Sequence, residues 1–459
     1  MSTHFDAIII GAGQAGPPLA GRLTQTGKQV AFIERKLFGG TCVNTGCIPT
    51  KTMVASAYAA NMARRASDFG IQIHGSVQVD MKAVKARKDA ISAKSRDGVE
   101  GRLRGMKNCT VFHEQAQFAG SNEVKVGAET IAAEQIFINV GGRAIVPDMP
   151  GINDISYLTN STMLELEELP RHLVVIGGSY VGLEFAQMFH RFGSQVTVVE
   201  KGPRLVQHED EDISAAIKEI LETEGIQIRL SAECIAFEKG SDSIGVHVTC
   251  ETGEPQVHGS HVLLAVGRKP NTDDLALDKA GVRVDERGYI VVDDQLRTNV
   301  PGIWALGDCN GRGAFTHTSY NDFEIVAANL LDNDPRRVSD RIQAHAMYID
   351  PPLGRVGMTE AEVRHSGKAA LMATRPMTKV GRAVEKGESQ GFMKALVDAE
   401  SKKILGAAIL GTGGDEAIHC ILDVMYAGAP YTTITRAVHI HPTVSELIPT
   451  LLEDLKPLK

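Results

Sequence analysis

Two cysteines are the residues most able to do chemistry in this chain of 459 residues: Cys42 and Cys47, separated by four residues in GGTCVNTGCIPTK (39–51). Such a pair can bind a metal, form a structural disulfide or work as a redox couple. A tetrahedral zinc site uses four ligands, usually from a second cysteine pair or from histidines. No second close pair exists, and the nearest histidines, His4 and His74, lack ligand spacing. We therefore expect no metal centre.

The spacing of the two cysteines also constrains the local backbone. Residues five positions apart along a regular helix are separated by about 7.5 Å, which exceeds the roughly 7 Å limit for the Cα atoms of a disulfide. If Cys42 and Cys47 pair, the segment must be wound irregularly at a helix start. Asn44 and Gly46 tolerate such a backbone, and Pro49 suits a first helical turn.

A helix start favours reactivity over a purely structural role for this pair. The positive end of a helix stabilises a thiolate, and Lys51 adds a cation on the helical face of Cys47. Seven cysteines are few for this length, and a single close pair in a reducing cytosol indicates redox or catalytic use. We expect a working redox couple in the cytoplasm.

A histidine near the end of the sequence could exchange protons with such a thiol. His441 precedes Pro442 in RAVHIHPTVSELIPTLLEDL (436–455), and Glu446 follows. The proline stiffens the approach, so that the imidazole can be aimed. A glutamate that accepts from one ring nitrogen sets the tautomer and leaves the other nitrogen for a thiol. Taken alone, the same residues also describe an ordinary surface histidine before a helix.

A nucleotide-binding unit must help to position these residues. FDAIIIGAGQAGPPLAGRLTQTGKQVAFIE (5–34) reads as strand, glycine turn, helix and second strand, with the glycine spacing G-x-G-x-x-G. Gly11 permits the tight turn, Gly13 lets backbone N–H groups approach a pyrophosphate, and Gly16 permits close packing of helix on strand. Glu34 ends the second strand, where it can accept from ribose hydroxyls.

The same unit returns in LVVIGGSYVGLEFAQMFHRFGSQVTVVE (173–200). Gly177, Gly178 and Gly182 form its turn, and Ser179 replaces the middle glycine with only a small side chain. Two complete units in one chain imply two bound dinucleotides.

The acid that ends the second unit bears on the choice of coenzyme. Glu200 suits a free ribose 2′-hydroxyl and repels a 2′-phosphate. Lys201 and Arg204 follow closely and could shift that balance. We expect NADH as the coenzyme, with NADPH left open.

Two further strand–turn segments match one another. QIFINVGGRA (135–144) and HVLLAVGRKPN (261–271) each place an apolar strand before a glycine turn, and they resemble the closing strands of two nucleotide domains. We assign Gly141 to the first nucleotide site and Gly267 to the second. In IWALGDCNG, Asp308 follows a strand, where its carboxylate could accept from a polyol hydroxyl.

Composition excludes several classes of protein. With 43% hydrophobic and 23% charged residues the chain is typical of globular proteins. Its net charge of -8, without a Lys/Arg run, offers no surface for nucleic acid or an anionic membrane. We see no secretory signal and no apolar stretch of about 18 residues that could span a bilayer.

The motifs and their order resemble the flavin disulfide reductases of the pyridine-nucleotide family, which includes dihydrolipoamide dehydrogenase, glutathione reductase and the core of mercuric reductase. The resemblance covers about residues 5–455 and rests on GGTCVNTGCIPTK, the two fingerprints, the GD-containing segment and HIHPTVSE. It implies FAD at the first fingerprint, bound through the three glycines and Glu34, with Asp308 at the ribityl chain. It implies the nicotinamide nucleotide at the second.

The resemblance also implies roles for the reactive residues. Lys51 and Glu184 match an ion pair beside the flavin ring. Cys47 matches the thiol that faces the flavin, and Cys42 matches the interchange thiol that attacks substrate.

The family's fold has two Rossmann-like α/β dinucleotide-binding domains and a C-terminal α+β dimerisation domain. Within it the His441–Glu446 dyad reaches into the active site of the partner, which implies a homodimer. We divide the chain into an FAD-binding domain (1–150), an NAD(P)-binding domain (151–270), a central segment that completes the FAD site (271–342) and an interface domain (343–459).

The main hypothesis is an FAD-dependent NAD(P)H:disulfide oxidoreductase that acts on a small disulfide and contributes to cell redox homeostasis, or that runs in reverse to oxidise a dithiol with NAD+. A mercuric-type metal-ion reductase is the alternative, because DPPLGRVGMTE (350–360) resembles the core of that subgroup. Against it, no cysteine pair follows Cys420. A redox-sensing or scaffold flavoprotein within a complex is a third hypothesis.

Overall fold

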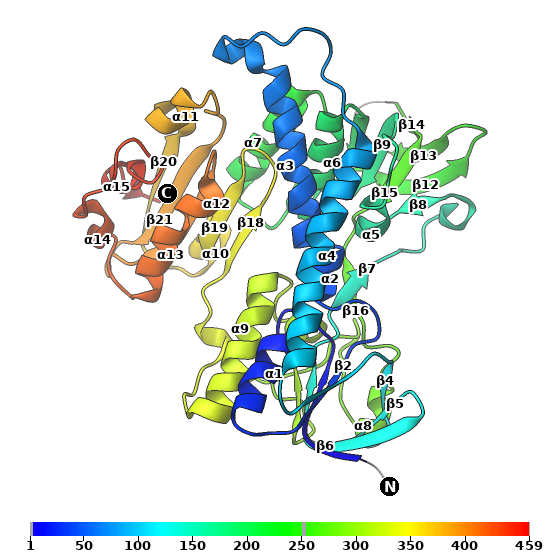
Figure 1. Cartoon of the computed structure of the whole chain (residues 1–459). Coiled ribbons are helices and arrows are strands. Elements are labelled where there is room, and N and C mark those ends of the chain that lie inside the picture. The colour runs from blue at the N-terminus through cyan, green and yellow to red at the C-terminus, as the bar shows by residue number, and fades with distance from the viewer. Residues whose placement is uncertain (1–2, 250–253, 459) are drawn as a thin grey trace.

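A computed structural model describes residues 3–249 and 254–458 of the chain (Figure 1). The first nucleotide domain is built on a sheet of strand order β3-β2-β1-β6-β5-β4, in which β17 also pairs with β6. Its strands are β1 (Thr3–Ile10), β2 (Val30–Ile33), β3 (Cys109–Phe112), β4 (Ala116–Phe118), β5 (Glu123–Val126), β6 (Glu129–Ile138) and β17 (Ile303–Ala305). The central strands are parallel and apolar because helices cover both faces of such a sheet.

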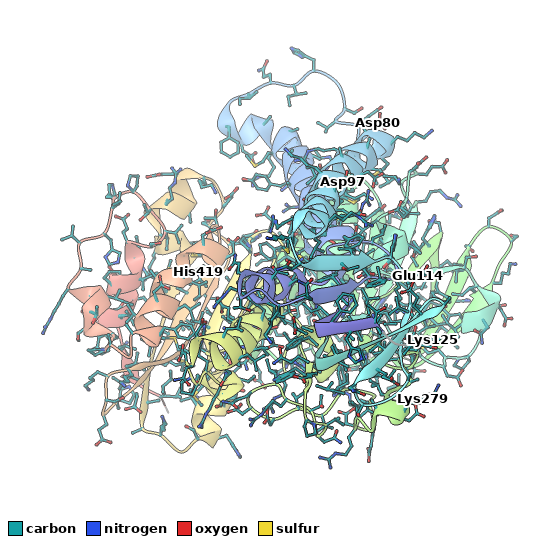
Figure 2. The ribbon with its side chains drawn as sticks, turned by 60° about the horizontal axis from the view of Figure 1, so that its bottom comes forward. Asp80, Asp97, Glu114, Lys125, Lys279 and His419 are labelled. Carbon is teal, nitrogen blue, oxygen red and sulfur yellow. The ribbon has the colours of Figure 1, made fainter. Side chains whose placement is uncertain are left out.

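Helices of this domain carry the reactive segment. They are α1 (Gly16–Gln25), α2 (Gly40–Asn44), α3 (Cys47–Arg64), α4 (Met81–Gly105) and α9 (Thr316–Ala327). The long helices α3 and α4 pack against each other in the middle of the molecule (Figure 1). Asp80 caps α4 by accepting from the backbone N–H of Ala83 at 3.1 Å, and Figure 2 labels Asp80 at the start of α4 and Asp97 within it.

The second nucleotide domain repeats the design with a parallel sheet of order β11-β10-β9-β15-β8. Its strands are β8 (Tyr157–Leu158), β9 (His172–Ile176), β10 (Gln195–Val199), β11 (Gln227–Arg229) and β15 (His261–Leu264), and its main helices are α6 (Tyr180–Phe192) and α7 (Glu211–Glu224). An antiparallel sheet of β12 (Glu233–Lys239), β13 (Ile244–Thr249) and β14 (Gln256–Gly259) lies beside it.

The C-terminal domain is an antiparallel sheet of order β18-β19-β22-β21-β20-β23 with short helices. The strands are β18 (Ala344–Met347), β19 (Leu353–Gly357), β20 (Ala370–Pro376), β21 (Phe392–Asp398), β22 (Ile404–Leu410) and β23 (Lys456–Pro457). Helices α10 (Glu360–His365), α13 (His419–Tyr426) and α15 (Leu447–Glu453) accompany it. The predicted fold class, two Rossmann-like domains and a C-terminal α+β domain, is thereby confirmed.

Short strands connect the parts. β7 (Gly142–Ala144) pairs antiparallel with β16 (Arg268–Pro270), so the segments after the two closing strands meet. After β16 the chain returns to the first sheet through β17, and α9 packs on α1. The numbered domain boundaries remain a prediction.

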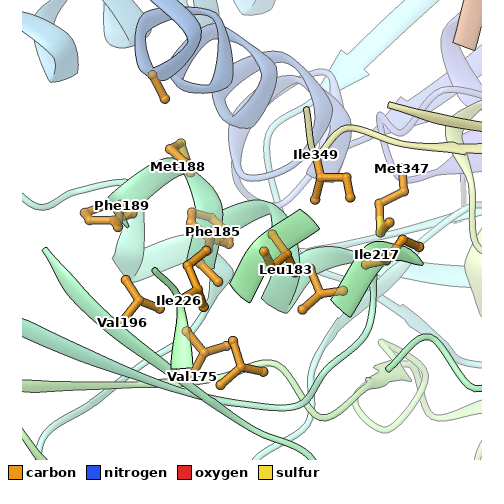
Figure 3. Packing of buried hydrophobic residues seen from close by; sticks show 14 of the residues in the cluster. Val175, Leu183, Phe185, Met188, Phe189, Val196, Ile217, Ile226, Met347 and Ile349 are labelled. Carbon is orange, nitrogen blue, oxygen red and sulfur yellow. The ribbon is translucent and has the colours of Figure 1, made fainter. Parts of the chain in front are cut away.

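One buried apolar cluster joins the second nucleotide domain to its neighbours. It includes Val175 of β9, Phe185 of α6 and Ile217 of α7, together with Met53 of α3 and Met347 of β18. Figure 3 shows the close packing of Val175, Phe185, Ile217 and Met347 in this cluster. The cluster fixes α3, which begins at Cys47, relative to the second domain. Among the described helices, none is both long and apolar enough to cross a membrane.

Candidate active site

The cysteine pair spans a break between two helices. Helix α2 ends at Asn44, and α3 begins at Cys47 with Gly46 as its N-cap. A Cβ on Gly46 would lie 2.9 Å from the backbone oxygen of Thr41, so only glycine fits this close approach. This break is the irregular winding at a helix start that pairing of the two cysteines would need. Both cysteines are free thiols, and Cys47 is exposed.

The surroundings of the two sulfurs separate their acidities. A hydrogen bond from Cys42 lowers the pKa of Cys47 to about 6; burial opposes this shift, while Thr316 and the charge of Lys51 reinforce it. Thr316 Oγ1 lies 3.1 Å from Cys47 Sγ. The hydrogen bond with Cys47 and burial both raise the pKa of Cys42 above its ordinary value. Cys47 is therefore the thiolate of the pair at neutral pH.

An ion pair lies one turn beyond Cys47. Lys51 Nζ is 2.6 Å from Glu184 Oε2, which joins α3 to α6. The other oxygen of the buried Glu184 accepts from the backbone N–H of Tyr348 at 2.9 Å. Lys51 Nζ also lies 4.7 Å from the centre of the Tyr348 ring. The structure thus brings together the two residues that the family resemblance pairs.

A cavity of about 2160 Å³ connects these residues to both glycine turns. Thirteen residues predicted from the sequence line it: Gly11, Gly13, Glu34, Cys42, Cys47, Lys51, Gly141, Gly177, Gly178, Glu184, Glu200, Gly267 and Asp308. Gly16 and Gly182 lie behind the turns, where an added Cβ would approach the backbone oxygens of Gly11 and Gly177 to 2.5 and 2.2 Å. Gly16 thus permits close packing of helix on strand, the role expected of it, and Gly182, expected to form the second turn, has the same close approach.

The first glycine turn fits a dinucleotide. Gly11 has a φ of +104°, and a Cβ there would lie 2.3 Å from the backbone oxygen of Asn139. Glu34 Oε2 accepts from the N–H of Ala12 at 2.8 Å, and Oε1 accepts from the N–H of Lys36 at 2.8 Å. The carboxylate is therefore fixed at the cavity wall with acceptor capacity left for a ribose.

Asp308 supplies a second polar group to the first site. It lies in a 3-10 turn (Gly307–Asn310) after β17. Burial raises the pKa of Asp308, and Arg268 Nε at 3.7 Å from its Oδ2 opposes that shift. A carboxyl group half-withdrawn from water in the cavity wall suits a hydrogen bond with a polyol hydroxyl.

The second turn repeats the first at atomic detail. Gly177 has a φ of +109°, and a Cβ there would lie 2.4 Å from the backbone oxygen of Ala265. Glu200 Oε2 accepts from the N–H of Gly178 at 2.6 Å. The hydrogen bonds Ala12–Glu34 and Gly178–Glu200 both join residues 22 positions apart. The two sequence units therefore form equivalent cradles, and both line the same cavity.

The C-terminal dyad is formed but lies elsewhere. His441 Nδ1 is 3.0 and 3.1 Å from the two carboxylate oxygens of Glu446. The His441 side chain is 81% exposed, and neither residue lines the cavity. The preceding Val438 and Ile440 are 100% and 80% exposed. Within one chain, then, the structure does not bring the dyad to the cysteines.

Sequence reasoning missed several residues of the cavity. Besides Thr316, these include a triad in which Tyr180 Oη donates to Glu209 Oε1 at 2.8 Å and His345 Nε2 lies 2.7 Å from the same oxygen. Glu209 is buried, and both of its partners line the cavity. No local pattern marks this triad, because its members come from three distant segments. The described residues hold no cluster of three or more His, Cys, Asp or Glu side chains suited to a metal ion.

Comparison with known proteins identifies the family that this chain resembles. Residues 5–322 match the model described as pyridine nucleotide-disulphide oxidoreductase, and residues 343–452 match the dimerisation domain of the same family. A probable pyridine nucleotide-disulfide oxidoreductase, RclA of Escherichia coli, is 36% identical over 98% of this chain and 99% of its own. A dihydrolipoyl dehydrogenase of Thermus scotoductus (96% and 95% covered) and a mercuric reductase of Streptomyces lividans (97% and 95%) are each 33% identical.

Solved structures agree with this result. The chain superposes with a TM-score of 0.89 on the HOCl-induced flavoprotein disulfide reductase RclA from Escherichia coli, at 36% identity over 98% of this chain and 99% of that one. A Cu(II) complex of the same reductase gives a TM-score of 0.90 at 35% identity, with 99% of both chains covered.

Proposed function

This chain belongs to the pyridine nucleotide-disulphide oxidoreductase family, and we propose that it reduces a small disulfide with NADH through Cys42 and Cys47. Membership makes it a flavin-dependent oxidoreductase that uses FAD and NAD(P)H. The observation that carries the proposal is a single cavity in which two nucleotide cradles meet a cysteine pair.

The FAD site is proposed at the first cradle, where Gly11, Gly13, Glu34 and Asp308 would hold the cofactor. When bound, FAD supplies transfer of an electron pair between a nicotinamide and a disulfide. The protein's own contribution is electrostatic. The Lys51–Glu184 pair keeps a cation close to Cys47, where it favours the thiolate.

The cysteines and the dyad divide the substrate chemistry. The raised pKa of Cys42 makes it a thiol that needs a base before it can attack a disulfide. We assign that base to His441 of a second subunit, oriented by Glu446. The protonated His441 then returns the proton to the leaving thiol. The exposed dyad and the match to a dimerisation domain support a homodimer. A cytoplasmic location fits a pair that must be reduced to act.

Preference for NADH rests on the second cradle. Glu200 faces the cavity, and its negative charge disfavours a 2′-phosphate. Of the two cations that could offset that charge, Arg204 is engaged elsewhere: Nη2 donates to the backbone oxygen of Gln207 at 2.9 Å, and Nη1 lies 3.3 Å from Glu211. Lys201 lines the cavity beside Glu200 and keeps NADPH open as the alternative.

Anaerobic titration of the holoenzyme with NADH tests the proposal. We expect a long-wavelength absorbance band from the Cys47 thiolate beside the cofactor, and its loss in Cys47→Ser. Steady-state turnover is then measured with lipoamide, glutathione disulfide and other small disulfides. Survival of the band in Cys47→Ser contradicts the role of Cys47, and absence of turnover with every disulfide contradicts the substrate class. It would also favour a redox-sensing or scaffold role.

A metal-ion reductase is the second candidate. Mercuric reductases stand among the relatives, and one solved relative is a Cu(II) complex. A thiolate at Cys47 is a ligand that soft metal ions prefer. NADH oxidation that depends on Hg(II) or Cu(II), and that exceeds the rate with disulfides under the same conditions, supports this candidate over the first.

A further inference from the structure

The two acids of the nucleotide cradles differ in one hydrogen bond. Glu34 accepts from two backbone N–H groups, those of Ala12 and Lys36. Glu200 likewise accepts from two backbone N–H groups, those of Gly178 at 2.6 Å and Gly202 at 2.7 Å. In addition, Gln207 Nε2 donates to Glu200 Oε1 at 3.0 Å.

The side chain of Gln207 is exposed and lies against its own loop. A Cβ on Gly202 would collide with the Gln207 side chain, so the glycine provides the space that the amide occupies. Arg204 Nη2 fixes the backbone oxygen of Gln207. Gln207 does not line the cavity, whereas Glu200 does. The amide therefore reaches the carboxylate from behind and leaves the nucleotide side open.

A third donor changes what the carboxylate offers to a ribose. An ionised carboxylate has about four acceptor positions; three are used in Glu200 and two in Glu34. The amide dipole also offsets part of the negative charge of Glu200, which weakens its repulsion of a 2′-phosphate. Both effects reduce the advantage of NADH over NADPH.

We propose that Gln207 is a positioning residue for coenzyme selection. Its hydrogen bond reduces the free acceptor positions and the effective negative charge of Glu200, so that the second cradle accepts NADPH beside the preferred NADH. The inference rests on the proposed function, since it assigns the nicotinamide nucleotide to this cradle. It adds a residue that acts on the coenzyme only through Glu200.

Two substitutions with opposite expected effects test it. Gln207→Leu keeps the size of the side chain and removes the donor, so the ratio of kcat/KM for NADH to that for NADPH should rise roughly fivefold. Gln207→Lys keeps a donor and adds a charge, so the ratio should fall. The changes should appear in KM, with kcat little altered. A loss of local structure would instead move both variants in one direction.

Gln195→Leu is the matched control. Gln195 is exposed at the start of β10, the end opposite Glu200, and makes no contact with Glu200 among the described residues. Calorimetric binding of NAD+ and NADP+ to each holoenzyme repeats the comparison without any disulfide or metal substrate. Failure of the proposed function therefore leaves this test intact. A binding ratio that stays within about twofold of the parent in both variants, or that shifts in the same direction in both, overturns the proposal.

Discussion

Thr316 Oγ1 lies 3.1 Å from Cys47 Sγ, although the two residues are 269 positions apart in the chain. Thr316 opens α9, and Cys47 opens α3, so the sulfur lies between two helix N-termini. A hydroxyl and two positive helix ends favour the thiolate over the thiol. Tertiary structure thereby supplies an activating group that the cysteine motif does not contain.

The hydroxyl of Thr316 should be measurable in the titration of Cys47. Thr316→Val removes a donor to the thiolate, so the pKa of Cys47 should move up from about 6 by roughly one pH unit. Less thiolate is then present at neutral pH. Ultraviolet thiolate absorbance of the reduced enzyme against pH measures the shift. Thr52→Val is the control, since Thr52 on α3 donates to the backbone oxygen of Ile48.

The charge of Lys51 should act on the same titration. Lys51→Met removes a cation that lowers the pKa of Cys47, and it leaves Glu184 buried without its partner. We expect a higher midpoint and slower reduction of the enzyme by NADH. Lys51→Arg keeps the charge and should stay near the parent. An unchanged midpoint in Lys51→Met would show that the ion pair has no electrostatic role at the sulfur.

Removal of the dyad should separate the two halves of the reaction. His441→Gln is expected to lower steady-state turnover of a disulfide by roughly 10²–10⁴-fold, because the proton transfer at sulfur loses its catalyst. Reduction of the enzyme by NADH in a single turnover should be unaffected, because the role assigned to His441 is proton transfer with Cys42 and the substrate thiol. Glu446→Gln should have a smaller effect in the same direction. Equal slowing of both phases would contradict the assignment.

A buried ion cluster between two domains should dominate local stability. The Lys394 side chain is 1% exposed, and its Nζ lies 2.5 Å from Glu360, 3.0 Å from Asp212 and 3.3 Å from Asp210. Lys394→Met removes the cation shared by the three carboxylates, although Asp210 keeps Arg355 and Glu360 keeps Arg364. The free energy of unfolding should therefore fall by about 1.5–3 kcal/mol, as for the loss of a charged hydrogen bond.

Chemical denaturation of the holoenzyme measures this loss. The pair Lys368–Asp398, at 3.9 Å with a half-exposed lysine, provides the control, because Lys368→Met should leave the free energy of unfolding nearly unchanged. A similar cost for the two substitutions would mean that the cluster with Lys394 is stabilised by solvent rather than by its own charges.

Local spacing along the chain was enough to predict the cradles and the redox pair. Gly11 and Gly177 adopt left-handed backbone conformations within turns of a few residues, and the acids at Glu34 and Glu200 follow one short helix later. A strand–turn–helix–strand unit is formed by residues close together in the sequence, so its residue pattern can be recognised from the sequence alone. The C-x4-C spacing similarly required a break in the helix.

The chain's distant contacts were decided only by the tertiary structure. Thr316 reaches Cys47 because the chain returns to the first sheet through β17, and His345 reaches Glu209 across 136 positions. The separation of His441 from the cysteines of its own chain has the same origin. Contacts between side chains that are hundreds of positions apart depend on how whole sheets pack, and no local residue spacing predicts that packing.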